Sequence, residues 1–171
     1  MPKSTTAYTT ANPPFKLTRV VEAPRARVWK AWTDASELQH WWGPKGCKLT
    51  VESLDFREGG FFHYAMQYSA GSAMWGRFLY REIAAPQRLV WLNSFANGQC
   101  GIVRAPFPGD LPLEIQNTVT FSGHDGGTTI ALQATPFGAS DAENAFFSAM
   151  FAGLAQGYGG TLDQLEAHLR G

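Results

Sequence analysis

The most regular pattern of apolar positions lies in residues 140–171. Large apolar side chains recur there at gaps of three or four residues: Phe147, Phe151, Leu154, Tyr158, Leu162, Leu165 and Leu169. Such gaps place all seven on one face of an α-helix. Ser140 followed by Glu143 is a capping-box pattern, so the helix is expected to begin there. The pattern predicts one amphipathic helix of about thirty residues, roughly 45 Å long at about 1.5 Å per residue.

Glycines interrupt the predicted helix at positions 153, 157, 159 and 160. Each costs about 1 kcal/mol relative to alanine in a helix interior. Three structures remain compatible with this pattern. The helix packs closely on a sheet through its small residues, or it bends near residues 157–160 and gates a cavity, or it breaks into two helices.

Upstream of residue 140 the pattern is mainly that of β-strands. Alternating apolar and β-branched residues predict seven strands, at residues 15–22, 47–55, 61–68, 75–83, 88–95, 114–122 and 128–137. Pro24 and Asp34 begin two short helices after the first strand, and Gly43 with Pro44 ends the second. Phe78 and Ile83 have opposite parity in their strand, so either a β-bulge intervenes or one of them faces outward.

The order of elements predicts a single α+β domain over residues 15–171. A curved antiparallel sheet is expected to wrap around the long C-terminal helix. Residues 1–14 are polar and lack an apolar segment, so we expect a flexible lead or an added strand there, and no signal peptide. Without a run of eighteen apolar residues, no membrane partner is expected.

Composition sharpens the choice of function. Fourteen acidic residues balance fourteen basic ones, which gives no basic face for nucleic acid. Aromatic residues reach 13 %, a content that suits a dense core or the wall of an apolar pocket. Cys47 and Cys100 fit free thiols in a reducing cytosol, although one disulfide stays open. The sequence does not decide between a monomer and a homodimer.

Several short motifs, spread in order over residues 15–170, resemble one superfamily. They are Ala23-Pro24-Arg25 with Val28-Trp29, Trp41-Trp42-Gly43-Pro44, Gly59-Gly60, Gly76, Ile83 with Pro86 and 88–90, 117–121, and 157–165. The set resembles the START-like (Bet v 1-like, SRPBCC) superfamily. Its nearest branch includes homologues of the activator of Hsp-type chaperone ATPase and the calicheamicin self-resistance protein. The resemblance implies the helix-grip fold, with a cavity between the sheet and the C-terminal helix.

Strand alternation then selects the side chains that face this cavity. In the loop at 96–112, the segment 104–108 is either a lid over the cavity mouth or a decorated surface loop. The expected ligand-binding residues are Trp42, Phe62, Tyr64, Met66, Phe78, Trp91, Asn93, Arg104, Phe107, Asn117, Val119, Phe147, Met150, Phe151, Leu154 and Tyr158. Asn93 and Asn117 either bond each other or a neighbour across the sheet, or they orient a polar group of the ligand.

No pattern for catalysis, metal binding or phosphate binding is present in the sequence. The four histidines lack metal-ligand spacing, and the glycine-rich turn at 123–127 joins two strands instead of opening a helix. We therefore expect a protein that binds a small apolar or aromatic molecule without a cofactor or catalysis. An enzyme acting on an aromatic or polyketide-like substrate is one alternative, with an inward His63 as its first candidate acid or base. A co-chaperone-like interaction module is the other.

Overall fold

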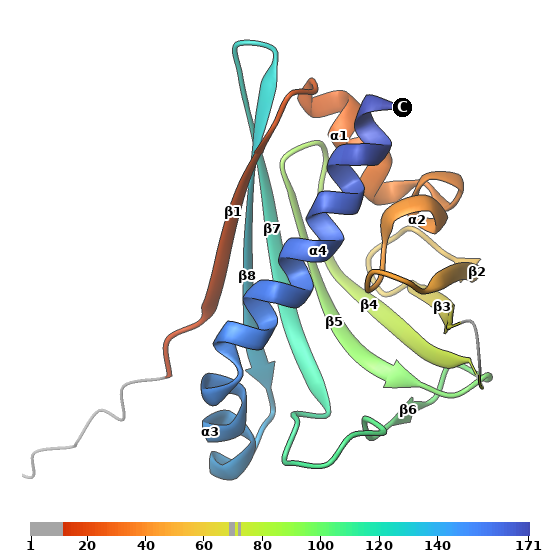
Figure 1. The fold of residues 1–171 in the computed structure, drawn as a ribbon, viewed down its shortest axis with the longest axis vertical. Coiled ribbons are helices and arrows are strands. Elements are labelled where there is room, and N and C mark those ends of the chain that lie inside the picture. Colours follow the sequence, from red (N-terminus) through yellow and green to blue (C-terminus); the bar gives the residue numbers. More distant parts are fainter. Residues whose placement is uncertain (1–11, 69–70, 72) are drawn as a thin grey trace, which may run out of the picture.

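The computed structural model describes residues 12–68, 71 and 73–171 as one curved antiparallel sheet partly covered by helices (Figure 1). The predicted alternative of an added strand in residues 1–14 falls mostly on residues 1–11, which lie outside the described residues. In chain order the elements are β1 (Phe15–Val21), α1 (Arg25–Thr33), α2 (Ala35–Trp41), β2 (Lys48–Leu54), β3 (Phe61–Gln67), β4 (Met74–Ala84), β5 (Arg88–Ala96), β6 (Ile102–Val103), β7 (Glu114–His124), β8 (Gly127–Phe137), α3 (Asp141–Ala149) and α4 (Phe151–Arg170).

The sheet has the strand order β1-β8-β7-β5-β4-β3-β2, and the short β6 pairs with β5. Every pairing is antiparallel. Helix α4 runs diagonally across one face of the sheet, and α1 and α2 lie beside its C-terminal part (Figure 1). This arrangement confirms the predicted α+β helix-grip fold.

The two short helices form where the sequence predicts them. Pro24 precedes α1, and Asp34 caps α2 by accepting a hydrogen bond from the Ser36 backbone N–H at 2.9 Å. The helices are held together by the Trp41 indole, whose Nε1 donates to the Ala31 carbonyl at 2.9 Å. They close one end of the sheet over a core of aromatic rings in contact that includes Trp32, Trp91 and Phe78.

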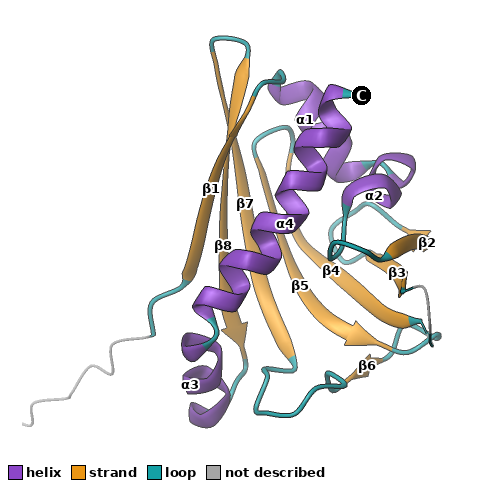
Figure 2. Cartoon of the chain, viewed as in Figure 1, coloured by secondary structure: helices purple, strands orange, loops and turns teal. Residues whose placement is uncertain are grey.

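The prediction of one continuous C-terminal helix is wrong at Met150. The capping box at Ser140 and Glu143 is present, but α3 ends at Ala149 and α4 begins at Phe151 (Figure 2). At the junction Met150 has φ −91° and ψ 0°, and its N–H bonds the Phe147 carbonyl, three residues back. That tight turn interrupts the α-helical ladder. The glycines at 157, 159 and 160 lie inside α4 without a break.

Two irregularities in the strands settle open questions from the sequence. The register of β4 against β5 shifts between Tyr80 and Glu82, so a bulge at Arg81 reconciles the parities of Phe78 and Ile83. The predicted loop at 96–112 begins as a tight hairpin, because β6 pairs back onto the end of β5. Only residues 104–113 remain as an irregular connection to β7.

None of the helices in the described part of the chain has the length and apolar character needed to cross a membrane. Cys47 and Cys100 are both free thiols, so the alternative of a disulfide between them is excluded in this structure.

Candidate functional site

A pocket of about 310 Å³ opens between α4 and the half of the sheet that the two short helices leave uncovered. Its wall is mostly apolar and comes from α4, from β3, β4 and β5, from the start of β7, and from two connecting segments. The lining residues are Trp42, Gly43, Pro44, Tyr64, Met66, Gly76, Asn93, Ser94, Phe95, Leu111, Pro112, Leu113, Ile115, Gly153, Leu154, Gly157, Tyr158 and Thr161.

Two glycines of α4 leave the helix side of this pocket open. Gly153 and Gly157 lie one turn apart, and a Cβ atom built on either would meet no heavy atom within 4 Å. Close packing of the helix against another backbone therefore does not explain these two residues. Gly160 differs, because the Lys45 side chain lies 3.5 Å from its Cβ position. The sequence alternative of a helix packed tightly through its small residues is wrong at Gly153 and Gly157.

The opposite wall is closely packed at Gly76 of β4. A Cβ atom on Gly76 would lie 2.5 Å from the Cζ and hydroxyl oxygen of Tyr64, a separation that real Cβ atoms do not reach. The Tyr64 ring therefore rests directly on the Gly76 backbone. Gly76 fixes the position of the Tyr64 hydroxyl on the pocket wall.

Two hydroxyl groups of the lining are already paired within the protein. Tyr158 donates to Oδ1 of the buried Asn117 at 2.7 Å, and Thr161 Oγ1 lies within hydrogen-bond distance of the Gly43 and Gly157 carbonyls. Asn117 therefore bonds a side chain of α4, not Asn93. Burial raises the pKa of Tyr158, so its hydroxyl keeps its proton at neutral pH.

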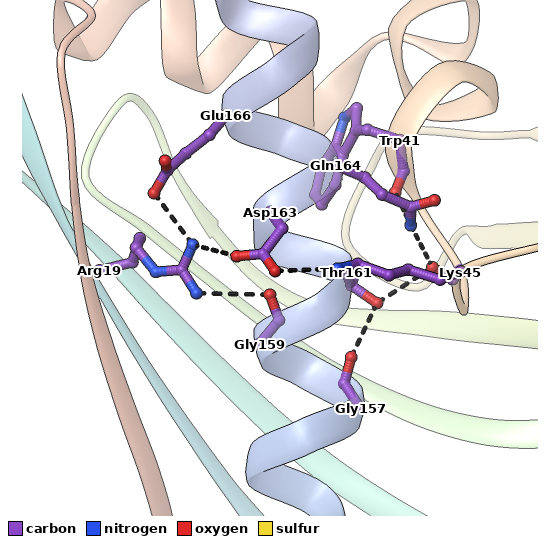
Figure 3. A network of polar contacts seen from close by, with 10 residues as sticks. Arg19, Trp41, Lys45, Gly157, Gly159, Thr161, Asp163, Gln164 and Glu166 are labelled. Atoms are coloured by element: carbon purple, nitrogen blue, oxygen red, sulfur yellow. Dashed lines mark hydrogen bonds and ion pairs between the residues drawn. The ribbon is translucent and has the colours of Figure 1, made fainter.

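A network of polar contacts attaches the C-terminal half of α4 to the rest of the domain (Figure 3). Arg19 of β1 donates to Asp163 at 2.8 Å and to Glu166 at 2.9 Å. Gln164 Nε2 donates to the carbonyls of Trp41 and Gly43, at 3.2 and 2.7 Å. These last contacts pair carbonyl groups at and just beyond the end of α2, and they hold pocket residues 42–44 against α4.

The connection at 104–113 contributes to the pocket through its last residues, whereas Arg104 and Phe107 were expected from the sequence to do so. Leu111, Pro112 and Leu113 line the wall. Arg104 instead forms an ion pair with Glu143 of α3 at 2.7 Å, and Phe107 is 55 % exposed against the edge of Phe95. The Phe146 ring of α3 fills the space beside Gly109. The connection is thus fastened to α3 on one side and faces the pocket on the other.

Six of the sixteen residues expected at the site line the pocket, namely Trp42, Tyr64, Met66, Asn93, Leu154 and Tyr158. The others do not. Phe62, Phe78, Trp91, Val119 and Phe147 are sealed in the hydrophobic core, and Asn117 is buried behind Tyr158. Phe151 packs on Phe15 and Phe147, and Met150 occupies the junction between α3 and α4. Among them, Trp91 and Phe78 are covered by Trp32 of α1 and by Trp42 just after α2.

Sequence reasoning missed twelve lining residues, and some of them carried a signal. The four-residue spacing of Gly153, Gly157 and Thr161 places them on one helix face beside Leu154 and Tyr158. The apolar run at 111–113 follows the proline-rich part of the loop and directly precedes β7. Ser94 could not have been selected by alternation, since its side chain belongs to the opposite face from Asn93.

His63 is turned away from the pocket. It is 3 % exposed, its ring stacks on Trp75, and its Nε2 lies 2.9 Å from the Asn97 carbonyl on the outer face of the sheet. The candidate acid or base of the enzyme alternative is therefore not at the site. Across residues 12–68, 71 and 73–171, no group of three His, Cys, Asp or Glu side chains is placed to hold a metal ion.

A curved antiparallel sheet, gripped by a long C-terminal helix over a pocket, defines a helix-grip domain of the START-like (Bet v 1-like) class. The family model described as Activator of Hsp90 ATPase homolog 1-like protein matches residues 22–170. The chain belongs to this family, as the resemblance implied.

Solved structures with the same fold include three bacterial proteins. Protein Ms6760 from Mycobacterium smegmatis is 29 % identical, with a TM-score of 0.69 over 89 % of this chain and 87 % of that one. A protein from Staphylococcus epidermidis is 26 % identical, with a TM-score of 0.74 over 93 % and 90 % of the two chains. A protein from Arthrobacter aurescens is 25 % identical, with a TM-score of 0.75 over 92 % and 86 %. No curated protein matches the chain.

Proposed function

We propose that this protein binds a small apolar or aromatic molecule in the pocket between α4 and the sheet. The observation that carries the proposal is the open space in front of Gly153 and Gly157. A glycine in a helix interior costs about 1 kcal/mol relative to alanine. An alanine methyl group would fit at both positions, so neither local packing nor helix stability accounts for the glycines. Both residues are exposed and line the pocket, where a larger side chain would occupy space that a ligand can use.

Size and chemistry of the pocket support the same function. Its volume of about 310 Å³ lies at the lower end of the usual range for ligand sites, about 300–1,000 Å³. The described lining residues include no acidic, basic or histidine side chain. Burial also raises the pKa of Tyr64 and of Tyr158, which leaves both as poor bases at neutral pH. These features favour binding of an uncharged molecule over acid–base catalysis.

The test is uptake of a neutral fluorescent probe, N-phenyl-1-naphthylamine, by the folded protein. Its emission should rise on binding, and Gly157→Leu should abolish the rise because the new side chain occupies the pocket. Ala155→Leu is the matched control, since Ala155 is exposed on the same helix and does not line the pocket. Absence of uptake by the native protein, or equal uptake by both variants, would refute the proposal.

Family membership favours a second candidate function, contact with an Hsp90-type chaperone that stimulates its ATPase. Such an activity would use the surface of the domain instead of its pocket. A strongly charged surface patch would support it, and the balanced and low charge of the chain argues mildly against it. The two functions separate in one assay: stimulation of a chaperone ATPase that is unaffected by Gly157→Leu would assign the activity to the surface.

A further inference from the structure

The polar groups around the pocket differ in whether the protein already satisfies them. The hydroxyl groups of Tyr158 and Thr161 have partners at 2.7–3.2 Å. The pair formed by Tyr64 and Asn93 is different, because part of its hydrogen-bonding capacity has no partner. Unsatisfied polar groups in an apolar wall are costly, which makes them informative about what occupies the space beside them.

The orientation of the Asn93 amide follows from its contacts. Its Nδ2 donates to the Arg77 carbonyl at 3.1 Å and to the Tyr64 hydroxyl at 3.3 Å. A backbone carbonyl only accepts, so the NH₂ group must face Arg77. The carbonyl oxygen of the amide, Oδ1, then has no donor among the described residues. Asn93 lines the pocket, which leaves this acceptor available to a ligand.

The Tyr64 hydroxyl supplies the complementary donor. Its oxygen accepts from Asn93, while no described residue accepts its proton. The side chain is only 3 % exposed, and its ring is fixed on Gly76. Burial raises the pKa of Tyr64 more than the neighbouring Trp42 and Asn93 side chains lower it. The group therefore stays protonated, and its O–H is available as a donor beside Asn93.

We propose that Tyr64 and Asn93 together recognise one neutral polar group of the ligand, a hydroxyl or an N–H amide. The Tyr64 hydroxyl donates to the oxygen of that group, and Asn93 Oδ1 accepts from its O–H or N–H. The ligand class is an uncharged aromatic or apolar molecule with a phenol-like or amide-like head. A carboxylate is disfavoured, because the described lining holds no cation to pair with it. This inference rests on the proposed function and narrows it.

The experiment compares naphthalene, 2-methoxynaphthalene, 2-naphthol and 2-naphthoate, each competing with the fluorescent probe for the full-length protein. Only 2-naphthol both accepts from Tyr64 and donates to Asn93, so it should bind about tenfold more tightly than 2-methoxynaphthalene, the value of one additional hydrogen bond. Naphthoate should bind more weakly than naphthol. Tyr64→Phe should reduce the affinity of both uncharged oxygen-bearing compounds by about tenfold relative to naphthalene.

Tyr158→Phe is the matched control, since it removes from the same pocket a hydroxyl that is already bonded to Asn117. It should change all four affinities by a similar factor. Equal affinity of the native protein for naphthol and methoxynaphthalene would overturn the recognition pair and leave the proposed function standing. That comparison needs no variant, so it holds even if Tyr64→Phe does not fold. Failure of every naphthalene to bind would overturn both.

Discussion

The two halves of α4 are parts of one helix with opposite packing. In the C-terminal half Thr161, Leu162 and Leu165 are buried, and these are the only buried residues of the described helix. In the N-terminal half Gly153 and Gly157 face open space. The same regular backbone thus serves as a packed element at one end and as the wall of a pocket at the other.

The difference shows where the stability of the domain resides. Polar contacts from Arg19 and Gln164, together with the buried leucines, fasten the C-terminal half to β1, α2 and the sheet. Because these contacts attach α4 to the domain, packing of its N-terminal half is not required to hold the helix in place. The N-terminal half is therefore free to leave a space that a ligand can enter.

The largest expected effect separates the two halves directly. Leu165 is fully buried, and Leu165→Ala should lower the free energy of unfolding by about 2–5 kcal/mol. Leu154 lines the pocket and is half-buried, so Leu154→Ala should cost clearly less. Urea unfolding of both variants measures the difference. Equal costs would mean that the two halves are packed alike.

A second comparison concerns alanine substitutions at glycines on the two sides of the pocket, Gly76 on the sheet and Gly153 and Gly157 on α4. Gly76→Ala forces a methyl group into the Tyr64 ring and should destabilise by about 1–3 kcal/mol. Combining it with Tyr64→Ala should give less than the sum of the two single effects, because the clash is then absent. A strictly additive pair, measured by thermal or urea unfolding, would show that the ring does not rest on Gly76.

The glycines of α4 should respond in the opposite direction. Gly153→Ala and Gly157→Ala should each raise the free energy of unfolding by up to about 1 kcal/mol, since the methyl group meets open space and alanine favours the helix. Gly159→Ala is the control, because its Cβ position is 3.9 Å from Arg19 and it does not line the pocket. All three should stabilise, and only the first two should weaken probe binding. Loss of stability at 157 would disprove the open space.

The smallest effect on stability is expected at the ion pair between Arg104 and Glu143, which is partly exposed. Arg104→Ala should leave unfolding nearly unchanged but speed the release of the naphthylamine probe, because residues 104–113 lose their attachment to α3. If Arg104→Ala instead reduced the free energy of unfolding and the affinity for the probe to the same extent, the connection at 104–113 would be a structural element. Stopped-flow dilution measures the release rate.

The same ion pair predicts a pH dependence. The hydrogen bond from Arg104, together with those from Ser140, lowers the pKa of Glu143 to about 2. A carboxyl group with a lowered pKa stabilises the attached state at pH values above the ordinary pKa of a glutamate. This stabilisation is lost as the pH falls through the lowered pKa. Probe release should therefore be constant from pH 7 to about pH 5 and should accelerate progressively as the pH falls from there toward about 2. A change near neutral pH would point to another group.

Local patterns in the sequence predicted most of the fold. Helix starts at Ser140 and Asp34 follow from side chains that cap their own backbone, so nearby residues suffice to find them. The break at Met150 carries no such signal. It arises where α3 turns to meet residues 104–113, a contact between segments far apart in the chain. The bulge at Arg81 was visible as a parity conflict, although its position was not.

The site was harder to predict because alternation identifies a face of the sheet but not what covers it. Tyr64 and Trp91 both point to the inner face. Trp91 is covered by Trp32 and Trp42, whereas Tyr64 lines the pocket together with Gly153 and Gly157 of α4. Which residues stay open depends on where α1 and α2 end, and that is a property of the whole fold.

The glycines at 153 and 157 also have a consequence for how such a domain diversifies. Larger residues at these two positions reduce the volume available to a ligand while they improve the helix, so selectivity for ligand size is uncoupled from the hydrophobic core. A lineage that narrows its pocket there gains stability in the same step. A return to glycine enlarges the pocket but destabilises the helix, so selection for a bulkier ligand would be needed to keep glycine at these positions.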